Sequence, residues 1–202
     1  MQNNTTGTIN VGVGFSALRD NTTGVSNTAV GGYAMTTNTT GGYNTAFGNR
    51  ALNDSSTGSF NTSVGYDALG TNTTASNNTA VGYLALNSNT TGASNIAIGA
   101  NALDAVTTES YNTAVGHSAL GANTANDNTA VGFNSLVSNT GGNYNTAVGS
   151  LALDACTTGV RNVAIGYGSL TTEIDGDLSV AMGYGALGTQ ESDGAGQDVL
   201  NT

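Results

Sequence analysis

The chain of 202 residues contains no proline, no tryptophan and no lysine, and it has only one cysteine and one histidine. A single cysteine, Cys156, cannot form an internal disulfide, and no Cys and His residues are spaced as zinc ligands. No apolar run is long enough to cross a bilayer as a helix. We therefore expect a fold that forms without a disulfide, a structural zinc ion or insertion into a membrane.

Charge is also scarce, since 8% of the residues are charged and the net charge is −10. Nucleic acids and anionic membranes bind clusters of Lys and Arg, so neither is expected as the main partner. The apolar residues make up 38% of the chain, the aromatic residues 6%. This composition is thin for the core of a compact globular domain.

A repeat of 17 residues accounts for this composition. Its consensus is N-T-A-V-G-Y-x-A-L-x-x-N-T-T-G-x-x, almost unbroken in residues 78–94. Repeat position 1 is Asn in ten copies and Ser in the eleventh, and one step is 16 residues long. These residues are Asn10, Asn27, Asn44, Asn61, Asn78, Asn95, Asn112, Asn128, Asn145, Asn162 and Ser179. Coils 1 to 11 are numbered below from these residues.

A 17-residue unit is too short for a pair of helices, and its Asn, Thr, Gly and β-branched residues disfavour helix. The sequence therefore predicts an all-β, parallel β-solenoid of about twelve coils, each stacked about 4.8 Å from the next. We expect two short strands per coil, one on N-T-A-V-G and one around A-L. The predicted organisation is a partial first coil (1–9), the repeat domain (10–195) and an irregular C-terminal end (196–202).

Repeat position 5 is the one invariant position. It is occupied by Gly14, Gly31, Gly48, Gly65, Gly82, Gly99, Gly116, Gly132, Gly149, Gly166 and Gly183. One interpretation is that another backbone approaches closely there, with an Ala-x-Gly stripe lining the contact between chains. The other is that glycine supplies a positive φ at a turn. The two interpretations are compatible.

Large apolar residues occupy repeat positions 4 and 9, and we expect both columns to fill the interior of the coil. Position 4 holds Val13, Val30, Phe47, Val64, Val81, Ile98, Val115, Val131, Val148, Ile165 and Met182. Position 9 holds Leu18, Leu52, Leu69, Leu86, Leu103, Leu120, Leu136, Leu153, Leu170 and Leu187, with Met35 in coil 2. Two such residues per coil are a small core, so we expect further surface to be buried between chains.

Two families carry a similar motif. The copies RNVAIGYGSL from Arg161 and SVAMGYGAL from Ser179 resemble the head repeats of trimeric autotransporter adhesins. The full 17-residue unit is similar to repeats of phage tail fibres. This resemblance implies a trimeric, left-handed, parallel β-roll that serves as the shaft or head of a fibre and attaches to a cell surface.

Candidate catalytic groups are few, and we expect no enzyme. His117 stands in a column otherwise rich in Tyr and Phe, which indicates a substitute within the column. Cys156 stands at a turn position where most copies have Asn, which predicts a surface or turn thiol without a partner base. The carboxylates around Asp175 and Asp177, and those in ESDGAGQD (191–198), are candidates for Ca²⁺, although neither segment matches a known calcium loop. No other cofactor is expected.

The sequence thus predicts a structural fibre segment, in a virion or outside the cell, whose partners are copies of itself and a carbohydrate or protein receptor. The outward Tyr and Phe column is a candidate carbohydrate surface, because aromatic rings stack on sugars. One alternative is an extracellular filament built by end-to-end stacking of open strand edges. A third hypothesis, an ice-binding module, rests on the Thr pairs at positions 13 and 14, although adjacent strand residues point to opposite faces.

Overall fold

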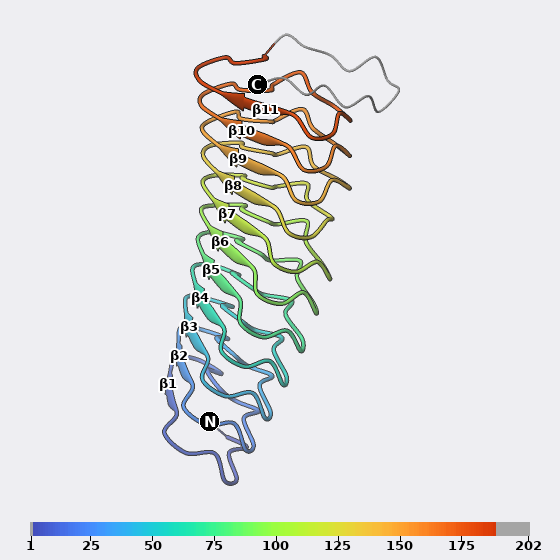
Figure 1. The fold of residues 1–202 in the computed structure, drawn as a ribbon. Helices are drawn as coiled ribbons and strands as arrows, with labels where there is room; N and C mark the ends of the chain where they lie inside the picture. Colours follow the sequence, from blue (N-terminus) through green and yellow to red (C-terminus); the bar gives the residue numbers. More distant parts are fainter. Residues whose placement is uncertain (1, 189–202) are drawn as a thin grey trace.

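The computed structural model describes residues 2–188 as a rod-shaped parallel β-solenoid (Figure 1). Its strands are β1 (Val11–Val13), β2 (Thr28–Val30), β3 (Thr45–Phe47), β4 (Thr62–Val64), β5 (Thr79–Val81), β6 (Ile96–Ile98), β7 (Thr113–Val115), β8 (Thr129–Val131), β9 (Thr146–Val148), β10 (Val163–Ile165) and β11 (Val180–Met182). They form one 11-stranded sheet in chain order. Equivalent residues pair directly, as Ala80 with Ala97. The predicted vertical rows of equivalent residues are therefore present.

Each coil contributes one strand to the sheet, whereas two were predicted. The second strand, expected around A-L, is absent from the described coils because the chain turns there. In coil 1, Ser16 and Leu18 have φ values of 56° and 50°, in the left-handed region that a strand cannot contain. The turns still stack through hydrogen bonds, such as the one from the Leu86 N–H to the Ala102 carbonyl at 2.9 Å.

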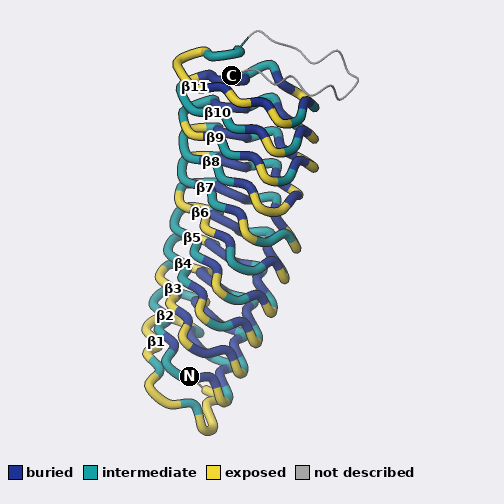
Figure 2. Tube along the Cα trace, viewed as in Figure 1, coloured by how far each residue is buried: buried dark blue, intermediate teal, exposed yellow. Residues whose placement is uncertain are grey.

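The core is narrow and consists of alanine, leucine and asparagine. Ala80 at position 3, Ala85 at position 8 and Leu86 at position 9 are fully buried, as are their equivalents in most coils. Figure 2 shows the buried residues along the inner side of the coils and the exposed ones at the outer turns. Leu187 in coil 11 is partly buried against this core.

The position 4 column lies outside the coil, where the structure differs from the prediction. In the middle strands the burial alternates, with position 3 buried and positions 2 and 4 facing outward. Val13, Phe47, Ile98, Val148 and Met182 are exposed. Val30, Val64, Val81, Val115, Val131 and Ile165 are half-buried. The space between the strand and the Leu turn is filled by alanine and asparagine, so the larger side chains point to the other face.

The position 5 glycines combine the two interpretations, but the close backbone belongs to the same chain. Gly99 has a φ of 135°, and a Cβ built on it would overlap the carbonyl of Gly116 in the next coil, 2.5 Å from its carbon. The equivalent glycines from Gly14 to Gly166 meet the next coil in the same way. The column is therefore a packing requirement of the solenoid itself.

The Asn residues at position 1 are buried and connect the coils. The Asn78 Oδ1 accepts a hydrogen bond from the Asn95 backbone N–H at 2.9 Å. The Asn78 Nδ2 donates to the Gly92 carbonyl at 2.8 Å. This pair of bonds recurs in neighbouring coils. One side chain thus satisfies a donor and an acceptor of the backbone inside the core.

A second Asn ladder, at position 12, is interrupted in coils 3 and 6. The Nδ2 of Asn38 donates to the Oδ1 of Asn21 at 2.7 Å and to the Gly41 carbonyl. The next residue in the column is Ser55, whose side chain is shorter. As a result the Asn38 Oδ1 and the Ser55 Oγ are both buried without a hydrogen-bond partner. Val106 interrupts the column in the same way and leaves the Asn89 Oδ1 unpaired.

We expect Ser55→Asn to stabilise the protein. An Asn at residue 55 would donate to the Asn38 Oδ1 and accept from the Asn72 Nδ2, so the two unpaired atoms would disappear. Removal of an unsatisfied buried group is worth about 1–3 kcal/mol. A higher midpoint of urea unfolding measures the effect, and Ser56→Asn, at the half-buried neighbouring position, is the control. An unchanged or lower midpoint for Ser55→Asn contradicts the ladder.

Candidate interaction surface

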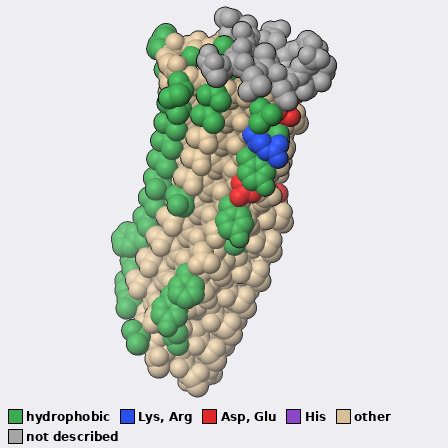
Figure 3. All heavy atoms as spheres, viewed as in Figure 1, with side chains coloured by type: hydrophobic (Ala, Val, Ile, Leu, Met, Phe, Trp, Pro, Cys, Tyr) green, Lys and Arg blue, Asp and Glu red, His purple; other side chains and the backbone are tan. Residues whose placement is uncertain are grey.

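The exposed large hydrophobic side chains gather on one side of the rod. With the exceptions of Tyr33 and Ile174, all of them stand at repeat positions 17, 2, 4 and 6. Positions 2 and 4 form the outward face of the strands, while positions 17 and 6 flank the strand on either side. Figure 3 shows a row of hydrophobic side chains along one edge of the rod, with separate patches beside it. We call these four columns the outward face.

The outward face carries almost no charge. Positions 1 to 6 of all eleven coils contain no Asp, Glu, Lys or Arg, in a chain with a net charge of −10. Within the four columns the charged residues are Asp127 and Arg161, both at position 17. A large, uncharged and partly apolar face on an acidic rod is typical of an interaction surface.

Aromatic rings stack along both flanks of this face. At position 6, Tyr66 and Tyr83 are stacked with centroids 5.7 Å apart, and Tyr167 and Tyr184 are stacked at 5.3 Å. At position 17, Tyr43 and Phe60 are stacked at 5.0 Å. These contacts join neighbouring coils within a column. The rings remain about half exposed, so they are free to contact a partner as well.

His117 belongs to the position 6 column, and its surroundings are those of the aromatic residues. Its ring is stacked on Phe133 with centroids 5.6 Å apart, and its Nδ1 lies 3.0 Å from the Ser118 Oγ. The structure therefore places the histidine in the row that the sequence indicated, on the exposed flank.

Cys156 lies at the predicted turn but is fully buried, so the expectation of a surface thiol does not hold. It replaces Asn in the position 12 ladder, with its Sγ 3.7 Å from the Gly159 carbonyl. Burial raises the pKa of the thiol to about 12. A thiol with this pKa is protonated at neutral pH and is a poor nucleophile.

The candidate calcium residues around Asp175 and Asp177 do not converge. The Asp177 Oδ1 accepts a hydrogen bond from the Val160 N–H at 2.7 Å, and the Glu173 Oε1 accepts one from Gly176 at 2.8 Å. Within residues 2–188, no group of three or more Asp, Glu, His or Cys residues is arranged to hold a metal ion. The segment ESDGAGQD lies outside the described residues.

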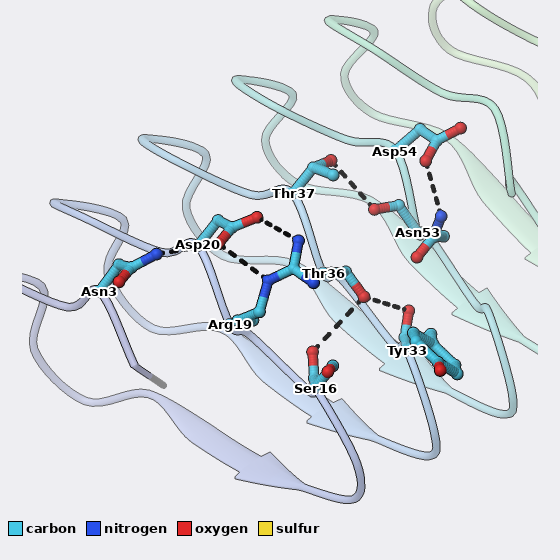
Figure 4. Close-up of polar contacts among 9 residues, drawn as sticks. All are labelled: Asn3, Ser16, Arg19, Asp20, Tyr33, Thr36, Thr37, Asn53 and Asp54. Atoms are coloured by element: carbon cyan, nitrogen blue, oxygen red, sulfur yellow. Dashed lines mark hydrogen bonds and ion pairs between the residues drawn. The ribbon is translucent and has the colours of Figure 1, made fainter.

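The three arginines are each engaged with a neighbour. Arg19 donates to both carboxylate oxygens of Asp20, at 3.0 and 2.7 Å, and Asn3 donates to the same carboxylate (Figure 4). This contact with Arg19 lowers the pKa of Asp20. Arg50 pairs with Asp67 at 3.3 Å, and Arg161 lies over the ring of Tyr144. The described chain thus offers no cluster of positive charge to an anionic partner.

The Thr columns divide into one that binds the next coil and one that is exposed. At position 13 the Thr22 Oγ1 donates to the Thr39 carbonyl at 2.9 Å, and most later coils repeat this bond. At position 14, Thr23 and its equivalents form a single exposed row at a corner. The predicted Thr pairs therefore do not form a two-column array for ice.

The candidate carbohydrate surface corresponds to the position 6 flank. A shallow pocket of about 350 Å³ lies beside Tyr167 and Tyr184, and Leu151 and Thr171 are among the residues that line it. Its walls combine two aromatic rings with one hydroxyl side chain.

No family model, curated protein or solved structure matches the chain. Within residues 2–188 there is no helix long and apolar enough to cross a membrane.

Proposed function

We propose that this chain is a segment of a structural fibre, located in a virion or outside the cell, which assembles as a parallel homotrimer and provides a rigid rod for attachment to a cell surface. The observation that carries the proposal is the outward face: an uncharged, partly apolar strip that follows the 11 strands of the rod. A surface of this kind is rare on a monomer and is typical of a contact between proteins.

Contact between copies of the chain fits this face better than a charged partner does. Two acidic rods repel each other wherever their charges meet, and positions 1 to 6 keep charge out of the contact. Eleven strands spaced about 4.8 Å apart and about 10 Å wide make a strip of roughly 500 Å² per chain. The flanking aromatic columns widen this strip toward the roughly 800 Å² per partner of a stable interface.

The contact between chains cannot use the Ala-x-Gly stripe that the sequence suggested. Ala29, Ala46 and Ala80 are fully buried inside their own coil, and the glycines pack against the next coil of the same chain. The outward Thr and Val columns of the same strands take its place at the centre of the assembly.

The solution mass tests the proposal. We expect light scattering to give three times the chain mass of 19.9 kDa over a wide range of protein concentrations. A double variant with Ile98→Lys and Val148→Lys is expected to be a folded monomer, because the outward face would then carry two charges. The control, Thr74→Lys with Thr91→Lys at the exposed corner, keeps the trimer. A wild-type monomer at every concentration overturns the proposal.

The alternative function, a filament that grows end to end, gives a different result in the same measurement. Its mass would increase steadily with concentration, and the lysine substitutions on the outward face would leave that growth unchanged. For the attachment role, we expect fluorescently labelled trimer to remain on cells after washing.

A further inference from the structure

The two flanks of the outward face have complementary side-chain sizes. In most coils, a large side chain at position 6 is accompanied by a small or short one at position 17, and the reverse. From coil 1 to coil 7 the pairs are Phe15 with Ser26, Gly32 with Tyr43, Asn49 with Phe60, Tyr66 with Asn77, Tyr83 with Ser94, Ala100 with Tyr111, and His117 with Asp127. Ser150 with Arg161 in coil 9 continues the pattern, whereas coils 8 and 10 have large residues at both positions.

Packing within one chain does not explain this pattern. The strand lies between the two columns, and the six steps from position 17 to the next position 6 span up to about 20 Å of extended chain. The stacked pairs Tyr66–Tyr83 and Tyr43–Phe60 each join residues of one column. A size match between two columns on opposite flanks becomes useful when the flank of one chain meets the opposite flank of another.

We propose that neighbouring copies interlock through these columns, with position 6 of one copy against position 17 of the same-numbered coil in the next copy. This register rests on the proposed assembly through the outward face. In a cyclic, parallel assembly each copy presents position 6 to one neighbour and position 17 to the other, so every flank is used.

The interlocking is specific in detail. The stacked pair Tyr66–Tyr83 enters a notch at Asn77 and Ser94 of the neighbour, closed at one end by its Phe60. The stacked pair Tyr43–Phe60 enters the notch at Gly32 and Asn49.

In coil 6 the ring of Tyr111 meets Ala100. In coil 7, His117 faces Asp127, which is the one place in the interlocked part where a basic side chain meets a carboxylate.

The sizes also select between two registers that the backbone allows. If the rise is uniform along a coil, position 6 lies about 1.7 Å above the position 17 that precedes its strand and about 3.1 Å below the one that closes its coil. Pairing with the preceding residue would place Tyr66 against Phe60 and leave Ala100 opposite Ser94, large against large and small against small. Pairing with the following residue gives the complementary set.

Disulfide crosslinking tests the register in full-length protein carrying Cys156→Ser. The first variant adds Ala100→Cys and Tyr111→Cys, and the matched control adds Ala100→Cys and Ser94→Cys. Tyr111 and Ser94 have nearly the same backbone conformation, with φ of 63° and 59°, so the two variants carry the same local cost. A disulfide needs Cα atoms within about 7 Å.

On mild oxidation we expect the first variant to lose its monomer band on a non-reducing gel and to give covalent trimers, while the control remains monomeric on the gel. Faster crosslinking of the control overturns the register. If neither variant crosslinks while light scattering still gives a trimer, the interlocking is wrong and the proposed assembly stands. A monomer in light scattering overturns both.

A size exchange provides the second readout. Ala100→Tyr fills a notch on an exposed flank, and we expect it to lower trimer stability at least tenfold in the dissociation constant, which corresponds to about 1.4 kcal/mol. The double variant Ala100→Tyr with Tyr111→Ala is expected to restore the trimer. An additive loss in the double variant contradicts the pairing of these two residues.

Discussion

Replacement of Gly99 or Gly116 by valine is expected to prevent the solenoid from folding through that coil. A Cβ at Gly99 would overlap the carbonyl of Gly116, and a φ of 135° is unfavourable for any residue with a side chain. The overlap is with the backbone of the next coil, so no change of rotamer relieves it. We expect a loss of more than about 4 kcal/mol, which is at the upper end for a single substitution.

Thermal unfolding followed by circular dichroism measures this effect, and Gly141→Ala is the control. A Cβ at Gly141 would stand 3.6 Å from the Thr158 Cγ2, an ordinary contact, so the control is expected to keep the wild-type midpoint or to exceed it slightly. A Gly99→Val protein with an unchanged midpoint would show that the coils can separate at this point, in contradiction to the structure.

Substitution of Asn78 by alanine is expected to destabilise the protein by about 3 kcal/mol. It removes the acceptor of the buried Asn95 N–H and one donor to the Gly92 carbonyl, and it leaves a small cavity. Urea unfolding measures the loss.

Two variants separate the hydrogen bonds of Asn78 from other causes. Asn78→Asp keeps an acceptor for the Asn95 N–H but cannot donate to Gly92, and it buries a charge, so its loss is expected to decrease as the carboxyl is protonated at low pH. Asn49→Ala, at an exposed position, is expected to change the midpoint very little. Equal midpoints for Asn78→Ala and Asn49→Ala would contradict the role of the ladder.

The period of the sequence was enough to predict the parallel solenoid and its vertical rows. A repeat of fixed length that ends each time on the same Asn-x-Ala-x-Gly segment allows equivalents to stack, and Thr79, Ala80 and Val81 do pair with Ile96, Ala97 and Ile98. The number of strands per coil was not predictable in the same way. The left-handed φ of Leu86, 52°, gives its segment the composition of a strand and the conformation of a turn.

Alternation along the strand showed that Ala80 and Val81 point to opposite sides, but the choice of the inner side followed hydrophobicity and was wrong for Val81. The variation within each column contains the missing signal. Position 3 accepts only Gly, Ala and Ser, as expected for close packing at constant volume, whereas position 4 ranges from Val13 to Phe47. A column whose volume varies this widely faces a boundary that can adapt.

The one coil of 16 residues reveals a seam along the rod. The missing residue falls at the exposed Thr corner, between Thr124 and Ala125, and Asn123 still donates to the Ala125 carbonyl at 2.7 Å. The strands on both sides keep their register, with Thr113 opposite Thr129. Changes in chain length are absorbed at this corner without disturbing the core or the outward face, so peptides grafted there would be displayed in a line with a spacing set by the coils.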